Sequence, residues 1–352
     1  KAPAAPATGA PGPLDSKATH YRAKARRVIF LYMDGGPSQV DTFDPKPALA
    51  KFHGQDPHRV FKVEPTQFNN IGKVLKSPWA FKRYGESGLP VSALFPTIGE
   101  HCADDLCVVR SMIAPFSEHT NANYFLHTGL GTAGRPGMGA WVSYGMGSLA
   151  DDLPGFVVLN GGLIPPGGLD CFSSSFLPAK HQGSIVLPRD RALANVEQRE
   201  GVDRQRRKLD LLGGLDQMGL ESSGDPDPIE GAIANGELAF RMQTAAPGIV
   251  DLSGETAATR KLYGLEDNTT AEFGIRCLLA RRMLERGVRF IQLYSGDTNG
   301  WDAHKSVLQN HTTWCARTDA PIAGLFDDLK ARGLWDDTLI IWGGEFGRTP
   351  MS

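Results

Sequence analysis

The sequence predicts an α/β fold, a three-layer sandwich in which a mostly parallel central sheet is covered by helices on both faces. Short apolar runs rich in β-formers alternate along the chain with segments of helical periodicity, which is the pattern of parallel strands joined by helices. A chain of 352 residues with 41% hydrophobic content also has enough apolar material for a large core. We therefore expect one extended α/β domain.

The first strand is predicted at residues 28–33, a continuous apolar run of the kind that a strand buried on both faces requires. Further strands are predicted at residues 107–110, 156–159, 185–187, 288–294 and 338–342. Two of the strands follow predicted helices, because apolar residues recur at helical spacing in 272–286, before Gly287, and in 319–332, before Gly333. Each pair predicts a helix-to-strand unit.

The chain divides into a short tether and a domain. Residues 1–20 are rich in Ala and Pro and begin with Lys1, as in the flexible segment that often follows a removed signal peptide. Export to the periplasm or the extracellular space is therefore expected, although a chain cut at this point for another reason would look the same. Within the domain, 21–352, residues 189–264 are rich in charge and in helix breakers, which predicts a peripheral excursion of helices and loops.

Composition argues against two classes of partner. With 37 basic and 39 acidic side chains, the net charge of -2 favours neither nucleic acid nor an anionic membrane. The longest apolar runs are far shorter than the ~20 residues that a membrane-spanning helix needs. Five cysteines without a CxxC pair argue against a zinc ribbon or a disulfide scaffold, and leave open one disulfide between Cys102 and Cys107. The oligomeric state is left open.

Candidate metal ligands follow three of the predicted strands. Asp34 follows the first strand, Asp302 and His304 follow strand 288–294, and Glu345 follows strand 338–342. The carboxyl ends of parallel strands share one edge of a sheet, so we expect these side chains to converge. Carboxylates together with an imidazole suit zinc, and also manganese or calcium. The pattern therefore predicts one or two divalent metal ions.

Each candidate ligand also has a structural interpretation. Asp34 could cap a helix, and Asp302 could belong to an ordinary turn. His304 could be a surface imidazole, and Glu345 could form a salt bridge with Arg348. Their shared position after strands favours the metal site.

Three blocks carry a resemblance to a known family. Residues 32–45 (YMDGGPSQVDTFDP) resemble the opening of the DUF1501 family, which is abundant in planctomycetes and related to sulfatases and alkaline phosphatases. Residues 300–304 (GWDAH) are similar to the WDxH region of that family, and residues 342–350 (WGGEFGRTP) are similar to its most recognisable motif.

The resemblance implies an alkaline-phosphatase-like sandwich and a metal-dependent hydrolase of phosphate or sulfate esters, acting on a small-molecule or polysaccharide ester. It implies that Asp34 and Glu345 bind one metal and that Asp302 and His304 bind a second. The nucleophile of such enzymes lies at the start of a helix after an early strand, which in this chain is the position of His119 or Thr120.

The chain departs from the sulfatase pattern in two places. It has no CxPSR-type motif, so three roles remain open around the predicted helix 121–127. Thr120 could attack the ester while the helix N-terminus and Asn121 or Asn123 hold the oxyanion, His119 could be a nucleophile or a ligand, or both could simply cap the helix. Family members also continue through a GRDHH-like segment with further histidines, whereas this sequence stops at Ser352, so we expect a C-terminally incomplete domain and metal site.

Two other functions compete with hydrolysis. One is a catalytically inactive exported surface or carbohydrate-binding protein that keeps the hydrolase fold. The other is a nucleotide-binding α/β protein, which is disfavoured because the glycines at 129–132 and 161–162 lack the spacing of a phosphate-binding loop.

Overall fold

The computed structural model describes residues 21–22, 24–63, 66, 71–160, 165–187, 200–222, 227–295 and 300–351. The expected tether, 1–20, lies outside the described residues.

A five-stranded parallel sheet forms the centre of the molecule, with strand order β5-β4-β6-β1-β7. The strands are β1 (Arg27–Tyr32), β4 (Phe156–Leu159), β5 (Ser184–Val186), β6 (Phe290–Tyr294) and β7 (Thr338–Gly343). β1 lies between β6 and β7, with Ile29 opposite both Ile291 and Ile340. The prediction that these three strands are neighbours is confirmed, so their carboxyl ends share one rim.

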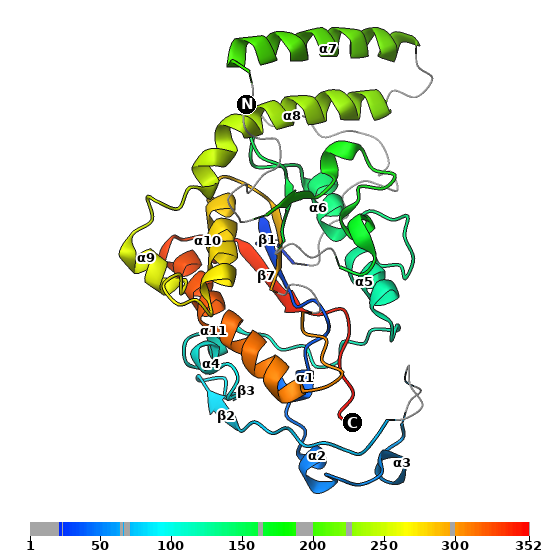
Figure 1. Ribbon diagram of the computed structural model, residues 1–352, viewed down its shortest axis with the longest axis vertical. Coiled ribbons are helices and arrows are strands. Elements are labelled where there is room, and N and C mark those ends of the chain that lie inside the picture. Colours follow the sequence, from blue (N-terminus) through cyan, green and yellow to red (C-terminus); the bar gives the residue numbers. More distant parts are fainter. Residues whose placement is uncertain are drawn as a thin grey trace.

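Helices cover both faces of the sheet, as Figure 1 shows, with α10 (Ala271–Glu285) and α11 (Val307–Ala331) on one face and α5 (His119–Thr128) and α6 (Met138–Met146) on the other. Side chains of β1 alternate between the two layers. Ile29 and Leu31 join the core cluster under α10 and α11, whereas Phe30 and Tyr32 join the cluster under α5 and α6. The predicted α/β sandwich is confirmed.

Shorter elements decorate this framework. β2 and β3 form an antiparallel hairpin that packs against α4. This hairpin was not predicted from the sequence. The shorter elements are β2 (Phe81–Tyr84), β3 (Leu89–Ser92), α1 (Gln39–Thr42), α2 (Pro47–Lys51), α3 (Pro57–Val60), α4 (Pro96–Cys102), and the 3₁₀ helices η1 (Ala103–Asp105), η2 (Gly168–Phe172) and η3 (Ala179–His181).

The region expected as an excursion contains three helices, α7 (Val202–Ser222), α8 (Asp227–Val250) and α9 (Ala257–Leu262). In Figure 1, α7 is the outermost helix and lies along α8. Arg206 of α7 joins them through two hydrogen bonds to Glu237, 3.0 and 2.6 Å long. Residues 188–199 and 223–226 lie outside the described part.

Two sequence predictions are corrected by the structure. Residues 107–110 are not a strand: Val109 is 58% exposed, and no strand among the described residues lies beside the segment to complete its backbone hydrogen bonds. The helix predicted from residue 319 begins at Val307, because its buried stripe extends back through Trp314 and His311.

The disulfide left open between Cys102 and Cys107 is absent. Cys102 is buried and Cys107 is exposed, and both are free thiols. Among the described helices, none is long and apolar enough to cross a membrane.

Candidate metal centre

The loops after β1 and β7 bring Asp34 and Glu345 together in the interior. Only 4% of Asp34 and 3% of Glu345 is exposed. The backbone N–H of Gly35 donates to both carboxylate oxygens of Glu345, at 3.1 and 3.2 Å. The Tyr32 hydroxyl lies 3.0 Å from Glu345 Oε2 and 3.4 Å from Asp34 Oδ1, so one phenol contacts both carboxylates.

Gly35 also allows the 300–304 loop to pack closely against the loop after β1. Its φ is +106°, and an added Cβ would overlap the backbone N of Asp302, so no other residue fits without a shift. The neighbouring carbonyl of Asp34 accepts from the Trp301 N–H at 2.7 Å. These contacts set Asp302 beside the carboxylate pair.

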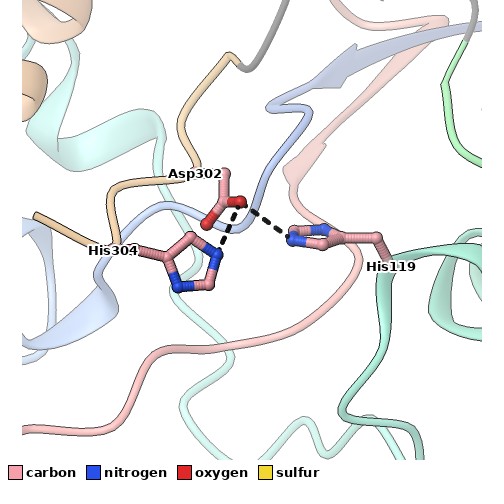
Figure 2. A group of neighbouring side chains, drawn as sticks. All are labelled: His119, Asp302 and His304. Atoms are coloured by element: carbon pink, nitrogen blue, oxygen red, sulfur yellow. Dashed lines mark ion pairs between the residues drawn. The ribbon is translucent and has the colours of Figure 1, made fainter.

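His119, Asp302 and His304 form a second group at the same rim. Figure 2 shows both imidazoles turned toward the Asp302 carboxylate, with His119 approaching from the opposite side to His304. Asp302 Oδ2 lies 3.3 Å from His119 Nε2 and 3.0 Å from His304 Nε2. Each residue offers one ligand atom, and these atoms lie within 4.8 Å of one another, a spacing that one metal ion could bridge.

His119 joins the two groups, because its other ring nitrogen, Nδ1, lies 2.7 Å from Glu345 Oε1. The structure therefore brings all four predicted metal ligands and His119 into one continuous network of hydrogen bonds and ion pairs. Asp34 enters this network through Tyr32, and His304 enters it through Asp302.

Arg348 lies at the edge of the network. Its guanidinium pairs with Asp302 Oδ1 and also donates to the backbone carbonyls of Gly35 and Gly36. The alternative salt bridge between Arg348 and Glu345 does not form. The Arg348 guanidinium pairs with Asp302 instead. Sequence reasoning did not assign Arg348 a place in the site, although it belongs to the motif that contains Glu345.

The electrostatics follow from burial and crowding. Burial, followed by the charge of Glu345, raises the pKa of Asp34 from its ordinary value of 3.8 to about 7. The hydrogen bond to Glu345 raises the pKa of His119. This favours the protonated, positively charged imidazolium form of His119 between the Glu345 and Asp302 carboxylates. Burial alone would raise the pKa of Asp302, but the hydrogen bond and charge of Arg348 outweigh it and lower that pKa. Without a metal, protons and basic side chains compensate the negative charge.

The start of α5 offers few free groups for catalysis. Glu118 caps the helix by accepting from the Asn121 N–H at 3.1 Å, and the Thr120 hydroxyl donates to the other Glu118 oxygen at 3.0 Å. The Asn121 amide donates to the Gly131 carbonyl at 2.8 Å. Asn123 is fully buried, and its amide nitrogen donates to the His119 carbonyl at 2.9 Å. Each of these donors therefore has a partner within the protein.

One of the glycines considered for a phosphate-binding loop, Gly129, has a structural role instead. Gly129 ends α5 in the left-handed conformation, with φ of +76°, and is a helix C-cap. Gly161 and Gly162 lie outside the described residues.

Fold and site together define an α/β protein with a cluster of carboxylates and imidazoles at the carboxyl ends of its central strands. The family model for DUF1501, a protein of unknown function, matches residues 25–352. The chain therefore belongs to the DUF1501 family. No curated protein and no solved structure matches it.

Proposed function

We propose that this protein is a metal-dependent hydrolase of phosphate or sulfate esters, related to alkaline phosphatases and sulfatases and exported to the periplasm or the extracellular space. The observation that carries the proposal is the convergence of Asp34, Glu345, His119, Asp302 and His304 at one rim of a parallel sheet. Ligands collect at this rim in open α/β folds.

The donor set fits a divalent metal ion. Asp302, His304 and His119 would hold one ion through oxygen and two nitrogens, and Asp34 with Glu345 would hold a second through oxygen. Mixed nitrogen and oxygen ligation suits zinc best, with manganese as a further candidate and calcium suited to the oxygen-rich half. The raised pKa of Asp34 supports this fit, because it reflects negative charge that the protein alone compensates poorly.

When bound, the metal would supply positive charge that polarises the ester oxygens and lowers the pKa of an attacking water. The residues of the chain would position the reaction. Arg348 has donors suited to a sulfate or phosphate oxygen, and its side chain is 22% exposed beside Asp302. His119, held by Glu345 on one side and Asp302 on the other, would act as a ligand in a fixed orientation.

Water is a better candidate for the nucleophile than Thr120. The Thr120 hydroxyl donates to Glu118, which also caps α5, so attack by Thr120 would require breaking that contact. Hydrolysis by water transfers the phosphoryl or sulfuryl group directly to the water oxygen. The bond to the alcohol oxygen breaks, and the alcohol leaves with a proton.

A catalytically inactive surface or carbohydrate-binding protein is the second candidate. The observation in its favour is that two carboxylates of the cluster are already paired within the protein, since Arg348 pairs with Asp302 and His119 bridges Asp302 to Glu345. Such a network could hold the rim together without performing chemistry.

Metal analysis combined with an ester screen distinguishes the two candidates. We expect the purified protein to bind zinc and to hydrolyse an aryl phosphate or aryl sulfate, with activity lost in EDTA and restored by zinc. Glu345→Gln should weaken zinc binding and abolish hydrolysis. Asp319→Asn is the control, because Asp319 is a buried carboxylate that accepts from the backbone N–H groups of Thr97 and Ile98 at the start of α4 and is not one of the proposed ligands. Metal binding without hydrolysis of any ester would favour the inactive protein.

A further inference from the structure

Tyr32 stands at the floor of the candidate metal centre and was not among the residues singled out from the sequence. It is the last residue of β1 and is fully buried. Its ring packs edge-on against His127 and Tyr294, with ring centres 5.0 Å away in both cases. This packing fixes the position of its hydroxyl group.

The hydroxyl faces three acceptor oxygens. They are Asn123 Oδ1 at 2.5 Å, Glu345 Oε2 at 3.0 Å and Asp34 Oδ1 at 3.4 Å. The Asn123 amide nitrogen donates to the His119 carbonyl, which leaves its oxygen to face Tyr32. A phenol carries one proton and cannot donate to three acceptors at once. The hydroxyl can therefore donate fully to only one of these oxygens, and Glu345 Oε2 also accepts from the Gly35 N–H at 3.2 Å.

The same contacts connect the separate elements of the site. Through Glu345, the phenol contacts the loop after β7, and through Asn123 it contacts the first turn of α5, which carries His119. Glu345 and His119 contact each other directly at 2.7 Å. Tyr32, Asn123, His119 and Glu345 thus form a closed ring of contacts across the floor of the centre.

We propose that Tyr32 is the positioning residue of the metal centre, holding the Glu345 carboxylate and, through Asn123, the His119 end of α5 in the geometry that binds the ion. The inference rests on the metal centre proposed above. Partners behind metal ligands orient them, and their loss typically lowers metal affinity by about 10 to 100-fold. Tyr32→Phe keeps the ring and its packing but removes the hydroxyl, so this range is the expected loss.

Tyr294→Phe is a matched control. Tyr294 is also fully buried and packs against Tyr32, but its hydroxyl accepts a hydrogen bond from the Gln292 amide at 3.1 Å. Both variants lose one buried phenol hydroxyl, so a general effect on packing or stability should be similar in the two.

Zinc affinity measured by isothermal titration calorimetry on chelator-stripped protein tests the inference, with thermal unfolding as a check on folding. We expect affinity about 10 to 100-fold weaker for Tyr32→Phe and within about twofold of wild type for Tyr294→Phe. Equal affinity of Tyr32→Phe and wild type, or an equal loss in both variants, would overturn the role of Tyr32. A wild-type protein that binds none of zinc, manganese and calcium would instead refute the metal centre itself.

A second variant covers the case in which Tyr32→Phe does not fold. Asn123→Ala leaves Tyr32 in place and breaks its connection to the His119 carbonyl. We expect this variant to bind zinc more weakly than wild type. Unchanged zinc affinity would show that the chain of contacts from Tyr32 does not position the ligands.

Discussion

Asp34→Asn should change stability in opposite directions without and with metal. The substitution keeps the shape of the side chain but removes a charge that is 4% exposed and close to Glu345. In the metal-free protein this charge is unfavourable, whereas in the proposed metal-bound protein it is a ligand. The variant therefore separates the destabilising effect of the Asp34 charge in the metal-free protein from the stabilising effect of the bound ion.

The magnitude follows from the pKa of Asp34, which rises from 3.8 to about 7 on folding. A carboxyl whose pKa is higher in the folded state gives stability that is fully present below pH 3.8 and is lost as the pH rises through about 7. At about 1.4 kcal/mol for each tenfold change in proton affinity, this difference corresponds to about 4 kcal/mol. Loss of the hydrogen bond from the Tyr32 hydroxyl to Asp34 offsets about 1 kcal/mol of this gain in the variant. Near pH 8 the metal-free variant should therefore be about 3 kcal/mol more stable than wild type.

Urea unfolding in EDTA, followed by tryptophan fluorescence from pH 4 to pH 8, measures this difference. We expect the gain in the variant to shrink as the pH falls, because wild-type Asp34 then takes up its proton. With zinc at pH 8, wild type should gain more stability than the variant, which loses one ligand of the second ion. Asp302→Asn is the control of opposite sign, because Arg348 lowers the pKa of Asp302 and its ionised form stabilises the fold. A gain of the same size at pH 4 and pH 8 would refute the reasoning.

Three further changes test other parts of the structure. His119→Ala should weaken zinc binding by about 10 to 100-fold in calorimetry, and more than His304→Ala, because the side chain of His304 is 58% exposed. Arg348→Gln should raise KM for an anionic ester by about tenfold with a smaller effect on kcat in steady-state assays, if the guanidinium binds the substrate. Gly324→Ala should lower the free energy of unfolding by about 1 to 3 kcal/mol, because its Cβ would overlap a carbonyl oxygen at the end of α9. Gly213→Ala, with open space around it, should instead stabilise α7 by up to about 1 kcal/mol in urea unfolding.

The central strands were predictable because their apolar runs are continuous. Residues 156–159 form β4 with the predicted bounds, β1 is shifted by one residue toward the N-terminus, and β7 ends one residue later than predicted. The β2–β3 hairpin was missed because its short strands alternate poorly and are partly exposed. The 107–110 segment has strand-forming residues but no sheet neighbour, and local propensity cannot report whether a neighbour is present.

The candidate ligands could be placed at one rim because they follow the carboxyl ends of strands. Asp34 and Glu345 each lie two residues past the end of a strand, and parallel pairing of β1 with β7 brings them together. Tyr32 looks like an ordinary core residue in the sequence, because alternation places it inside but does not report which polar atoms lie beside its hydroxyl. The pairing of Arg348 with Asp302 depends on side-chain direction at the end of an irregular loop, for which sequence periodicity carries no signal.

The position of β1 between β6 and β7 has a consequence for the order of events during synthesis. β1 is the first strand made, but both of its neighbours come late in the chain, and Glu345 follows Tyr32 by 313 positions. At about 5 to 20 residues per second, the ribosome takes roughly 15 to 60 s to cover that distance. Until β6 is complete at Tyr294, the apolar β1 segment has no native sheet partner, and contacts so distant in sequence also close slowly. The first described strand therefore stays without a sheet partner for most of the synthesis of the described domain, and Asp34 and Glu345 can meet only after almost all the rest of it has been translated.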